Sequence, residues 1–238
     1  MPRVAVIHHL AEASCGHAAA ALAEAGIELD ERRPREGDPL PGLDEVDGLL
    51  SLGGEQSVLD RGLGEEAALL RAAVARELPV LGVCLGAQVL AEALGGRVRR
   101  LERRMVAWPR IAPLPAAAGD PLFGALPPGA AALHWNEDGV EPPPGAVELV
   151  RRPAAGAGAS AFRVGRRAWG VQFHPEVDEA ILDGWYRDWP AACGQAGVSV
   201  ARARAADARH LRGQRALADA IFGGFARVVA RRGARVPA

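Results

Sequence analysis

Lysine is missing from this 238-residue sequence, so all 28 side chains counted as lysine or arginine are arginines. A Walker A phosphate loop requires a lysine, and pyridoxal-phosphate or Schiff-base chemistry requires an amine that can lose its proton. Arginine cannot take that second role, because its guanidinium stays protonated. The sequence therefore excludes phosphate-loop nucleotide hydrolases and enzymes that form a lysine Schiff base.

Long hydrophobic runs and cysteines are also scarce. No apolar run approaches the ~18 residues of a membrane span. The opening "MPRVAVIHHLAEAS" lacks the long apolar core and the cleavage site of a signal peptide, and it reads as a first core strand. The three cysteines, Cys15, Cys84 and Cys193, lie far apart and leave an odd thiol under any pairing. This favours a reducing compartment over a disulfide framework, so we expect a cytoplasmic protein without membrane contact.

No excess of one charge is present either, since the formal net charge is -1. Nucleic-acid binding is therefore not expected of the chain as a whole. The C-terminal segment is rich in arginine, and Leu217, Ile221, Phe225 and Val228 fall on one face of a helical pattern there. That segment could contact RNA or an acidic partner. We favour a docked helix with solvated arginines, because the apolar stripe must be buried.

Short apolar runs alternate with alanine-rich helical patterns through the first half of the chain. We expect strands at 3–7, 27–31, 46–54 and 79–83, and helices at 15–26, 64–77 and 85–94. This alternation is typical of βαβ units and predicts a doubly wound α/β fold with a mostly parallel sheet.

Beyond residue 97 the sequence becomes rich in proline and glycine. Four short β-like segments follow, at 131–135, 146–150, 159–164 and 168–173, and they predict an antiparallel continuation of the same sheet. A linker-like break at 190–198 precedes the arginine-rich helical segment. We therefore expect one domain at 1–190 and a helical C-terminal extension at 191–238.

The stretch "PVLGVCLGAQVLAEALGG" contains the strongest candidate for a reactive residue. Cys84 stands between Gly82 and Gly86 in the Gly-x-Cys-x-Gly spacing of a nucleophile elbow. The helix that follows directs its positive dipole end at the sulfur, and the N–H of Leu85 is a ready oxyanion donor. Because cysteine is also a common buried residue, this motif alone leaves packing and catalysis as equal alternatives.

Two further motifs favour catalysis. An apolar run ends at His174-Pro175-Glu176, which offers a base for the thiol and a carboxylate to orient that base. The glycine pair Gly53-Gly54 ends the third expected strand and can supply a second backbone N–H to an oxyanion hole.

The three motifs, in this order and spacing, resemble the class I (triad) glutamine amidotransferases over about residues 46–188. The similarity is strongest to stand-alone members related to the amidotransferase domain of GMP synthase, through "PVLGVCLGAQVLAEALGG", "LHWNEDGV", "SAFRVG" and "WGVQFHPEV". The resemblance implies that residues 1–190 form a flavodoxin-like α/β domain of this family.

The resemblance also implies a role for each matching residue. Cys84 would be the nucleophile, His174 the acid and base, and Glu176 its orienting partner. Gly54 and Leu85 would line the oxyanion hole. Four positions would bind substrate: Gly53, Gln88, Asn136 and Glu137.

Two positions depart from the family pattern. Glu55 stands where a proline usually follows the glycine pair, and its charge near the nucleophile would oppose thiolate formation. Asn136 and Glu137 replace a more usual His-Gly, which puts substrate preference in doubt.

The expected reaction is cysteine-dependent hydrolysis of a carboxamide through a thioester, with release of ammonia. No cofactor is required, and no histidine or cysteine pair has the spacing of metal ligands; the adjacent His8 and His9 should point to opposite faces of a strand. The substrate is glutamine or a γ-glutamyl compound. The alternatives are a subunit that delivers ammonia to a separate synthase, a free-standing γ-glutamyl hydrolase or peptidase, and a non-catalytic regulatory module.

Overall fold

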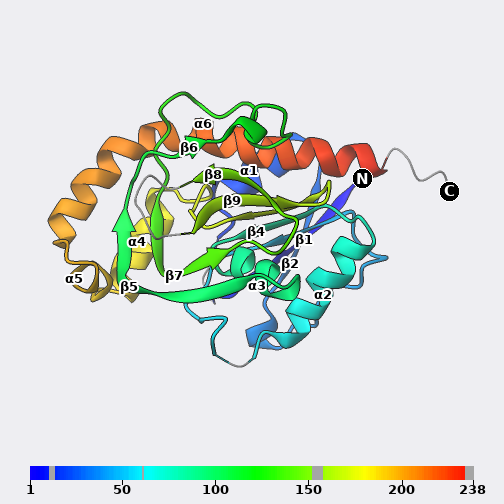
Figure 1. Cartoon of the computed structure of the whole chain (residues 1–238), viewed down its shortest axis with the longest axis horizontal. Helices are drawn as coiled ribbons and strands as arrows, with labels where there is room; N and C mark the ends of the chain where they lie inside the picture. The colour runs from blue at the N-terminus through cyan, green and yellow to red at the C-terminus, as the bar shows by residue number, and fades with distance from the viewer. Residues whose placement is uncertain (11–13, 61, 152–157, 234–238) are drawn as a thin grey trace.

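The computed structural model of the chain describes residues 1–10, 14–60, 62–151 and 158–233. It consists of an eight-stranded mixed sheet with helices on both faces, and a separate two-stranded sheet (Figure 1). The strands of the large sheet are β1 (Arg3–Ile7), β2 (Glu28–Arg32), β3 (Gly48–Ser51), β4 (Val80–Val83), β6 (Ala112–Pro113), β8 (Val147–Arg151), β9 (Ala159–Val164) and β10 (Ala168–Val171).

The strand order is β2-β1-β3-β4-β10-β9-β8-β6. The first five strands in this order are parallel, and β9, β8 and β6 continue the sheet in antiparallel pairing. The predicted α/β fold with a mostly parallel sheet and an antiparallel extension is therefore confirmed.

The helices are α1 (His17–Glu24), α2 (Gly64–Ala75), α3 (Leu85–Ala93), α4 (Glu179–Asp188), α5 (Ala192–Gln195) and α6 (Val200–Gly233), with short 3-10 turns η1 (Pro34–Glu36) and η2 (Pro115–Ala117). Helices α1 and α6 contribute to the hydrophobic core on one face of the sheet, and α2 and α3 to the core on the other. Alternate residues of one strand serve the two cores: Val4 and Val6 of β1 join the first, and Ala5 joins the second. In Figure 1, α6 runs along one side of the sheet, with α2 and α3 on the opposite side.

One prediction about the later strands is wrong. The segment at 131–135 was expected to extend the large sheet, but it leads into β7 (His134–Glu141), which pairs with β5 (Arg97–Ala107) in the separate two-stranded sheet. The sequence also gave no prediction of β5. Arginine and glutamate occupy most of this strand, and much of it is exposed, so no two-residue hydrophobic alternation marks it.

Helix α6 is docked, as we favoured from its apolar stripe. Leu217, Ile221 and Phe225 are buried in the same core as the parallel strands, whereas Val228 is only partly buried and Val229 takes the buried position beside it. Residues 234–238 at the end of the expected extension lie outside the described residues. The domain boundary near residue 190 stays a prediction. Within the described residues, no helix is long and apolar enough to cross a membrane.

Because α6 completes one core of the sheet, its apolar face should contribute strongly to stability. We expect Phe225→Ala to lower the free energy of unfolding by about 3–5 kcal/mol, since Phe225 is fully buried and its loss leaves a cavity. Arg227→Ala, an exposed position two residues further on, should change it by less than about 0.5 kcal/mol. Urea unfolding of both variants measures this, and equal effects would contradict a core role for α6.

Candidate active site

Cys84 lies at a sharp corner between β4 and α3. Its φ of 50° and ψ of -103° place a non-glycine residue in a sparsely populated backbone region, where strain of about 1–3 kcal/mol is typical. A Cβ on Gly82 would lie 2.5 Å from the carbonyl carbon of Gly86, and a Cβ on Gly86 would lie 2.2 Å from the carbonyl oxygen of Ser51. The two glycines are therefore required for strand and helix to approach closely enough to form the corner.

The structure brings His174 and Glu176 together beside this corner. His174 Nδ1 lies 2.7 Å from Glu176 Oε1, and both side chains are buried. A Cβ added to Gly53 would lie 2.9 Å from His174 Cε1 and 3.6 Å from the Cβ of Cys84, so the glycine adjoins both residues. With Nδ1 taken by the carboxylate, Nε2 is the ring nitrogen left for the thiol.

The electrostatics of the site favour a charged imidazole. Burial acts to lower the pKa of His174, but the Glu176 carboxylate and the Cys84 sulfur raise this pKa to about 10. Because the pKa is raised, the imidazolium form is present through neutral pH and is lost only as the pH rises toward 10. An imidazolium beside Cys84 stabilises a thiolate, which is the nucleophilic form of cysteine.

The glycine pair lies against the first turn of α3. A Cβ on Gly54 would lie 2.7 Å from Cδ2 of Leu85, and the N–H of Gly86 donates to the Leu52 carbonyl at 3.2 Å. The first hydrogen bond of the helix runs from Gln88 N–H to Cys84 O at 3.1 Å. The N–H of Leu85 therefore belongs to the helix start, where backbone donors have no partner within the helix. Gly54 and Leu85 are therefore neighbours at the start of α3.

A buried polar chain behind the glycine pair was not found from the sequence. His9 Nε2 lies 2.7 Å from Glu66 Oε2, its Nδ1 lies 3.1 Å from the Leu52 carbonyl oxygen, and Ser51 Oγ donates to Glu66 Oε1 at 2.6 Å. The sequence placed His9 only on one face of a strand, opposite to His8, and it gave Glu66 no role. The structure buries both and uses them to fix the segment that leads to Gly53.

Gln88, a predicted substrate ligand, is engaged inside the protein. Its Nε2 donates to Gln172 Oε1 at 3.2 Å and to the Asp138 carbonyl at 3.4 Å, and its residue is 3% exposed. Gln172 in turn donates to Cys84 Sγ at 3.6 Å. Gln88 therefore connects to Cys84 through Gln172, a residue that the sequence did not single out although it lies two positions before His174.

Asn136 and Glu137 both lie on β7 and make contacts within the protein. Asn136 is buried and donates to the Asp138 carbonyl at 2.7 Å. Glu137 pairs with Arg100 and with Arg104, the latter at 2.7 Å. Burial acts to raise the pKa of Glu137, but the two arginines hold this pKa below its ordinary value. The carboxylate is therefore ionised and already neutralised by the neighbouring strand.

The Glu55 carboxylate is paired at the rim of the site. It is exposed, lies 3.2 Å from Arg35, and accepts a hydrogen bond from Trp189 Nε1 at 3.4 Å. The expected opposition to thiolate formation is therefore reduced, because an arginine and solvent screen this carboxylate.

An open cavity of about 1000 Å³ lies on the outer side of His174 and Gly53. Trp135, Trp185 and Trp189 line part of it, and the Trp185 ring packs edge-on against the His174 ring with centroids 4.7 Å apart. The sequence reasoning did not identify this aromatic wall. Its tryptophans come from β7 and the segment around α4, which only the tertiary structure brings together.

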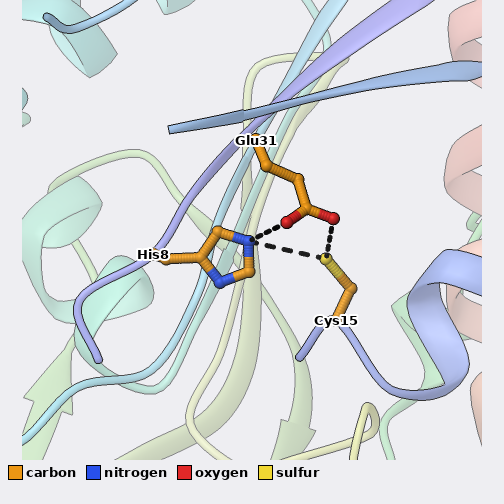
Figure 2. Close-up of side chains that lie close together, drawn as sticks. All are labelled: His8, Cys15 and Glu31. Atoms are coloured by element: carbon orange, nitrogen blue, oxygen red, sulfur yellow. Dashed lines mark hydrogen bonds and ion pairs between the residues drawn. The ribbon is translucent and has the colours of Figure 1, made fainter. Parts of the chain in front are cut away.

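Three potential metal ligands meet near the same cavity. His8, Cys15 and Glu31 place a ring nitrogen, a sulfur and a carboxylate oxygen all within 4.8 Å of one another (Figure 2). They are the only such cluster within the described residues. No ligand spacing in the sequence indicates this cluster, because His8, Cys15 and Glu31 do not form a short motif.

Comparisons with known proteins agree with this geometry. Residues 18–183 match the family described as glutamine amidotransferase class-I. GMP synthase (glutamine-hydrolysing) from Marinobacter nauticus is 34% identical over 142 residues, covering 56% of this chain and 26% of that protein. The same enzyme from Porphyromonas gingivalis is 32% identical over 179 residues, covering 69% of this chain and 34% of that protein. The chain thus spans about a fifth to a third of the length of these and the other similar GMP synthases.

A solved structure extends the similarity over nearly the whole fold. The glutamine amidotransferase from Methylobacillus flagellatus superimposes with a TM-score of 0.83 at 27% identity, covering 95% of this chain and 94% of that one. The family match spans well over half of the sequence and includes the elbow, the glycine pair and His174-Pro175-Glu176. The chain belongs to the class I glutamine amidotransferase family.

Proposed function

We propose that this chain hydrolyses the side-chain carboxamide of glutamine and releases ammonia and glutamate. The observation that carries the proposal is the buried 2.7 Å contact between His174 and Glu176, placed beside a cysteine that a strained corner holds at the start of a helix. The matched GMP synthases are named as glutamine-hydrolysing, which supports the same chemistry here.

The reaction follows from the positions of the groups. The Cys84 thiolate attacks the carboxamide carbon, forming a C–S bond while the carbonyl oxygen becomes an oxyanion held by the N–H groups of Gly54 and Leu85. His174 gives its proton to the nitrogen, the C–N bond breaks, and ammonia leaves a thioester. His174 then takes a proton from water, which attacks the thioester. The C–S bond breaks, and glutamate leaves as the thiolate and imidazolium are restored.

The remaining predicted residues have supporting roles in this proposal. Gly53 lines the cavity and adjoins both Cys84 and His174, which suits it to contact the substrate. Gln88 acts on the site through Gln172, because its amide nitrogen is bonded there. Asn136 and Glu137 shape the β7 side of the site. The reaction needs no cofactor.

A specific observation favours a second candidate. The cavity beside His174 is open and partly aromatic, with Trp185 and Trp189 in its wall, so it offers room for a substituent on the amide nitrogen. Such a site would serve a γ-glutamyl hydrolase that acts on γ-glutamyl amides. The triad chemistry is identical, and only the leaving amine differs.

We also propose a partner for the first candidate. The chain spans 26% and 34% of the two GMP synthases described above. A glutaminase that corresponds to this part of such an enzyme would deliver its ammonia to a separate synthase subunit. Addition of that subunit should then stimulate glutamine hydrolysis.

Replacement of the nucleophile should abolish turnover. We expect Cys84→Ala to reduce glutamate release by about 10⁴-fold or more, because no thioester can form without the sulfur. Cys193→Ala is the matched control, since Cys193 is a buried free thiol packed in a different core cluster. Glutamate release by both variants would be measured with glutamine. Turnover retained by Cys84→Ala would refute the mechanism.

Removal of the orienting carboxylate should change both rate and pH dependence. In Glu176→Gln the pKa of His174 should fall, because burial persists while the charge that raises the pKa is lost. The imidazolium would then disappear at a lower pH, so the alkaline limb of kcat/KM should move down and activity at neutral pH should drop by about 10²–10⁴-fold. An unchanged pH profile in Glu176→Gln would contradict the role of Glu176. Glu179→Gln is the control, because Glu179 is exposed at the nearby start of α4, and it should leave the pH profile unaltered.

A substrate panel separates the two candidate functions. If glutamine is the substrate, its kcat/KM should equal or exceed that of γ-glutamyl dipeptides and γ-glutamyl anilides, all read as glutamate release. A clear preference for the substituted amides would instead support the γ-glutamyl hydrolase. If substituted amides are preferred, Trp189→Ala should raise the KM for an aromatic γ-glutamyl amide by about two- to tenfold and leave the KM for glutamine unchanged.

A further inference from the structure

His8, Cys15 and Glu31 come from three separate elements and meet at one point. His8 follows the end of β1, Cys15 precedes α1, and Glu31 lies on β2. Cys15 Sγ lies 3.7 Å from His8 Nε2 and 3.9 Å from Glu31 Oε1, and His8 Nε2 lies 3.5 Å from Glu31 Oε2. Figure 2 shows the sulfur, the ring nitrogen and the carboxylate turned toward one another.

The way these atoms converge differs from a catalytic triad. In a triad, the carboxylate and the thiol use different nitrogens of the histidine ring, as Glu176 does with Nδ1 of His174. Here the sulfur and the carboxylate both approach the same nitrogen, Nε2 of His8. Nδ1 of His8 is buried and makes no hydrogen bond within the described part of the chain. This arrangement of three donor atoms around a common centre differs from a proton relay and is compatible with metal coordination.

From this convergence we propose that His8, Cys15 and Glu31 bind a zinc ion. With zinc bonds of about 2.0–2.1 Å to nitrogen, 2.3 Å to sulfur and 2.0–2.2 Å to oxygen, ligand atoms of a tetrahedral site lie roughly 3.3–3.6 Å apart. The sulfur–nitrogen separation of 3.7 Å is close to this range. With a single oxygen taken from Glu31, all three donor atoms lie within 4.8 Å of one another, so a rotation of the Glu31 carboxylate can complete the site. A thiolate, an imidazole and a carboxylate are a ligand set suited to zinc, and three protein ligands leave the fourth position open.

The surroundings fit an ion at this place. His8 and Cys15 are buried, whereas the Glu31 side chain is 41% exposed. His8 also lines the open cavity. An ion can therefore reach the three residues from solvent. Arg33 lies 3.2 Å from Glu31 Oε2. This leaves Oε1, the oxygen beside the sulfur, to bind the metal while Oε2 stays hydrogen-bonded to the arginine, as metal-bound carboxylates commonly are.

The site lies one hydrogen bond away from the catalytic residues. The N–H of His17, two residues after Cys15, donates to the carbonyl of Glu176 at 2.9 Å, and a Cβ on Gly16 would lie 2.0 Å from that same oxygen. A metal on Cys15 would therefore fix the segment that packs against Glu176. It would not contact Cys84, so binding and the proposed hydrolysis can be tested separately.

Cobalt(II) and zinc binding to the full chain test the proposal. One equivalent of Co²⁺ should give a thiolate-to-cobalt charge-transfer absorption, which one equivalent of Zn²⁺ then removes. Cys84→Ser should keep this signal, which excludes the other thiol–imidazole pair as its source, and Cys193→Ser should keep it as well. Cys15→Ser should lose the absorption.

Glu31→Gln provides the second arm, because it changes one partly exposed ligand with little change of shape. It should weaken Zn²⁺ binding by about tenfold to a hundredfold, measured by competition with a chromophoric chelator. Far-ultraviolet circular dichroism and thermal unfolding establish that each variant is folded. Absence of the charge-transfer absorption in the unaltered chain, its persistence in Cys15→Ser, or an unchanged affinity in Glu31→Gln would each overturn the proposal.

Discussion

The corner at Cys84 is the constraint on which the rest of the site depends. A cysteine with φ of 50° is unfavourable by itself, and it persists because strand β4 is locked in the middle of the parallel sheet while α3 packs directly behind it. Two glycines permit that packing, since a Cβ on Gly82 or Gly86 would collide with neighbouring backbone atoms. The sheet and the helix together hold the sulfur at the carboxyl ends of the strands, where α/β proteins commonly place their ligands.

Three carboxylates of the site each face an arginine or a histidine. Glu176 acts on His174, Glu137 is held by two arginines, and Glu55 faces Arg35 at the exposed rim. The Glu176 carboxylate helps to keep the His174 imidazole charged beside Cys84. Burial works in the opposite direction, and the carboxylate outweighs it because both partners are enclosed at 2.7 Å.

The two histidines that follow β1, His8 and His9, contact residues on opposite faces of the sheet. His9 reaches Glu66 on the α2 side and fixes the segment before the glycine pair, whereas His8 reaches Cys15 and Glu31 on the α1 side. This follows from the pleat, because adjacent residues of an extended strand point to opposite faces. The residues after β1 thus support the segment before Gly53 on one face and form the proposed metal site on the other.

The sequence by itself determined the fold class, the elbow around Cys84 and the pairing of His174 with Glu176, because these depend on local features: buried runs, helix periods, and glycines at fixed spacings. The sequence could not place β5 and β7 in a second sheet. The many arginines of β5 leave no alternation of apolar and polar residues to mark a strand, and the partner of a strand depends on residues distant in the chain. The internal bonds of Gln88, the burial of His9 with Glu66 and the tryptophan wall were likewise decided only by the tertiary structure. Each joins residues distant in the chain, and no local pattern encodes which side chains the sheet and its helices bring within hydrogen-bonding distance.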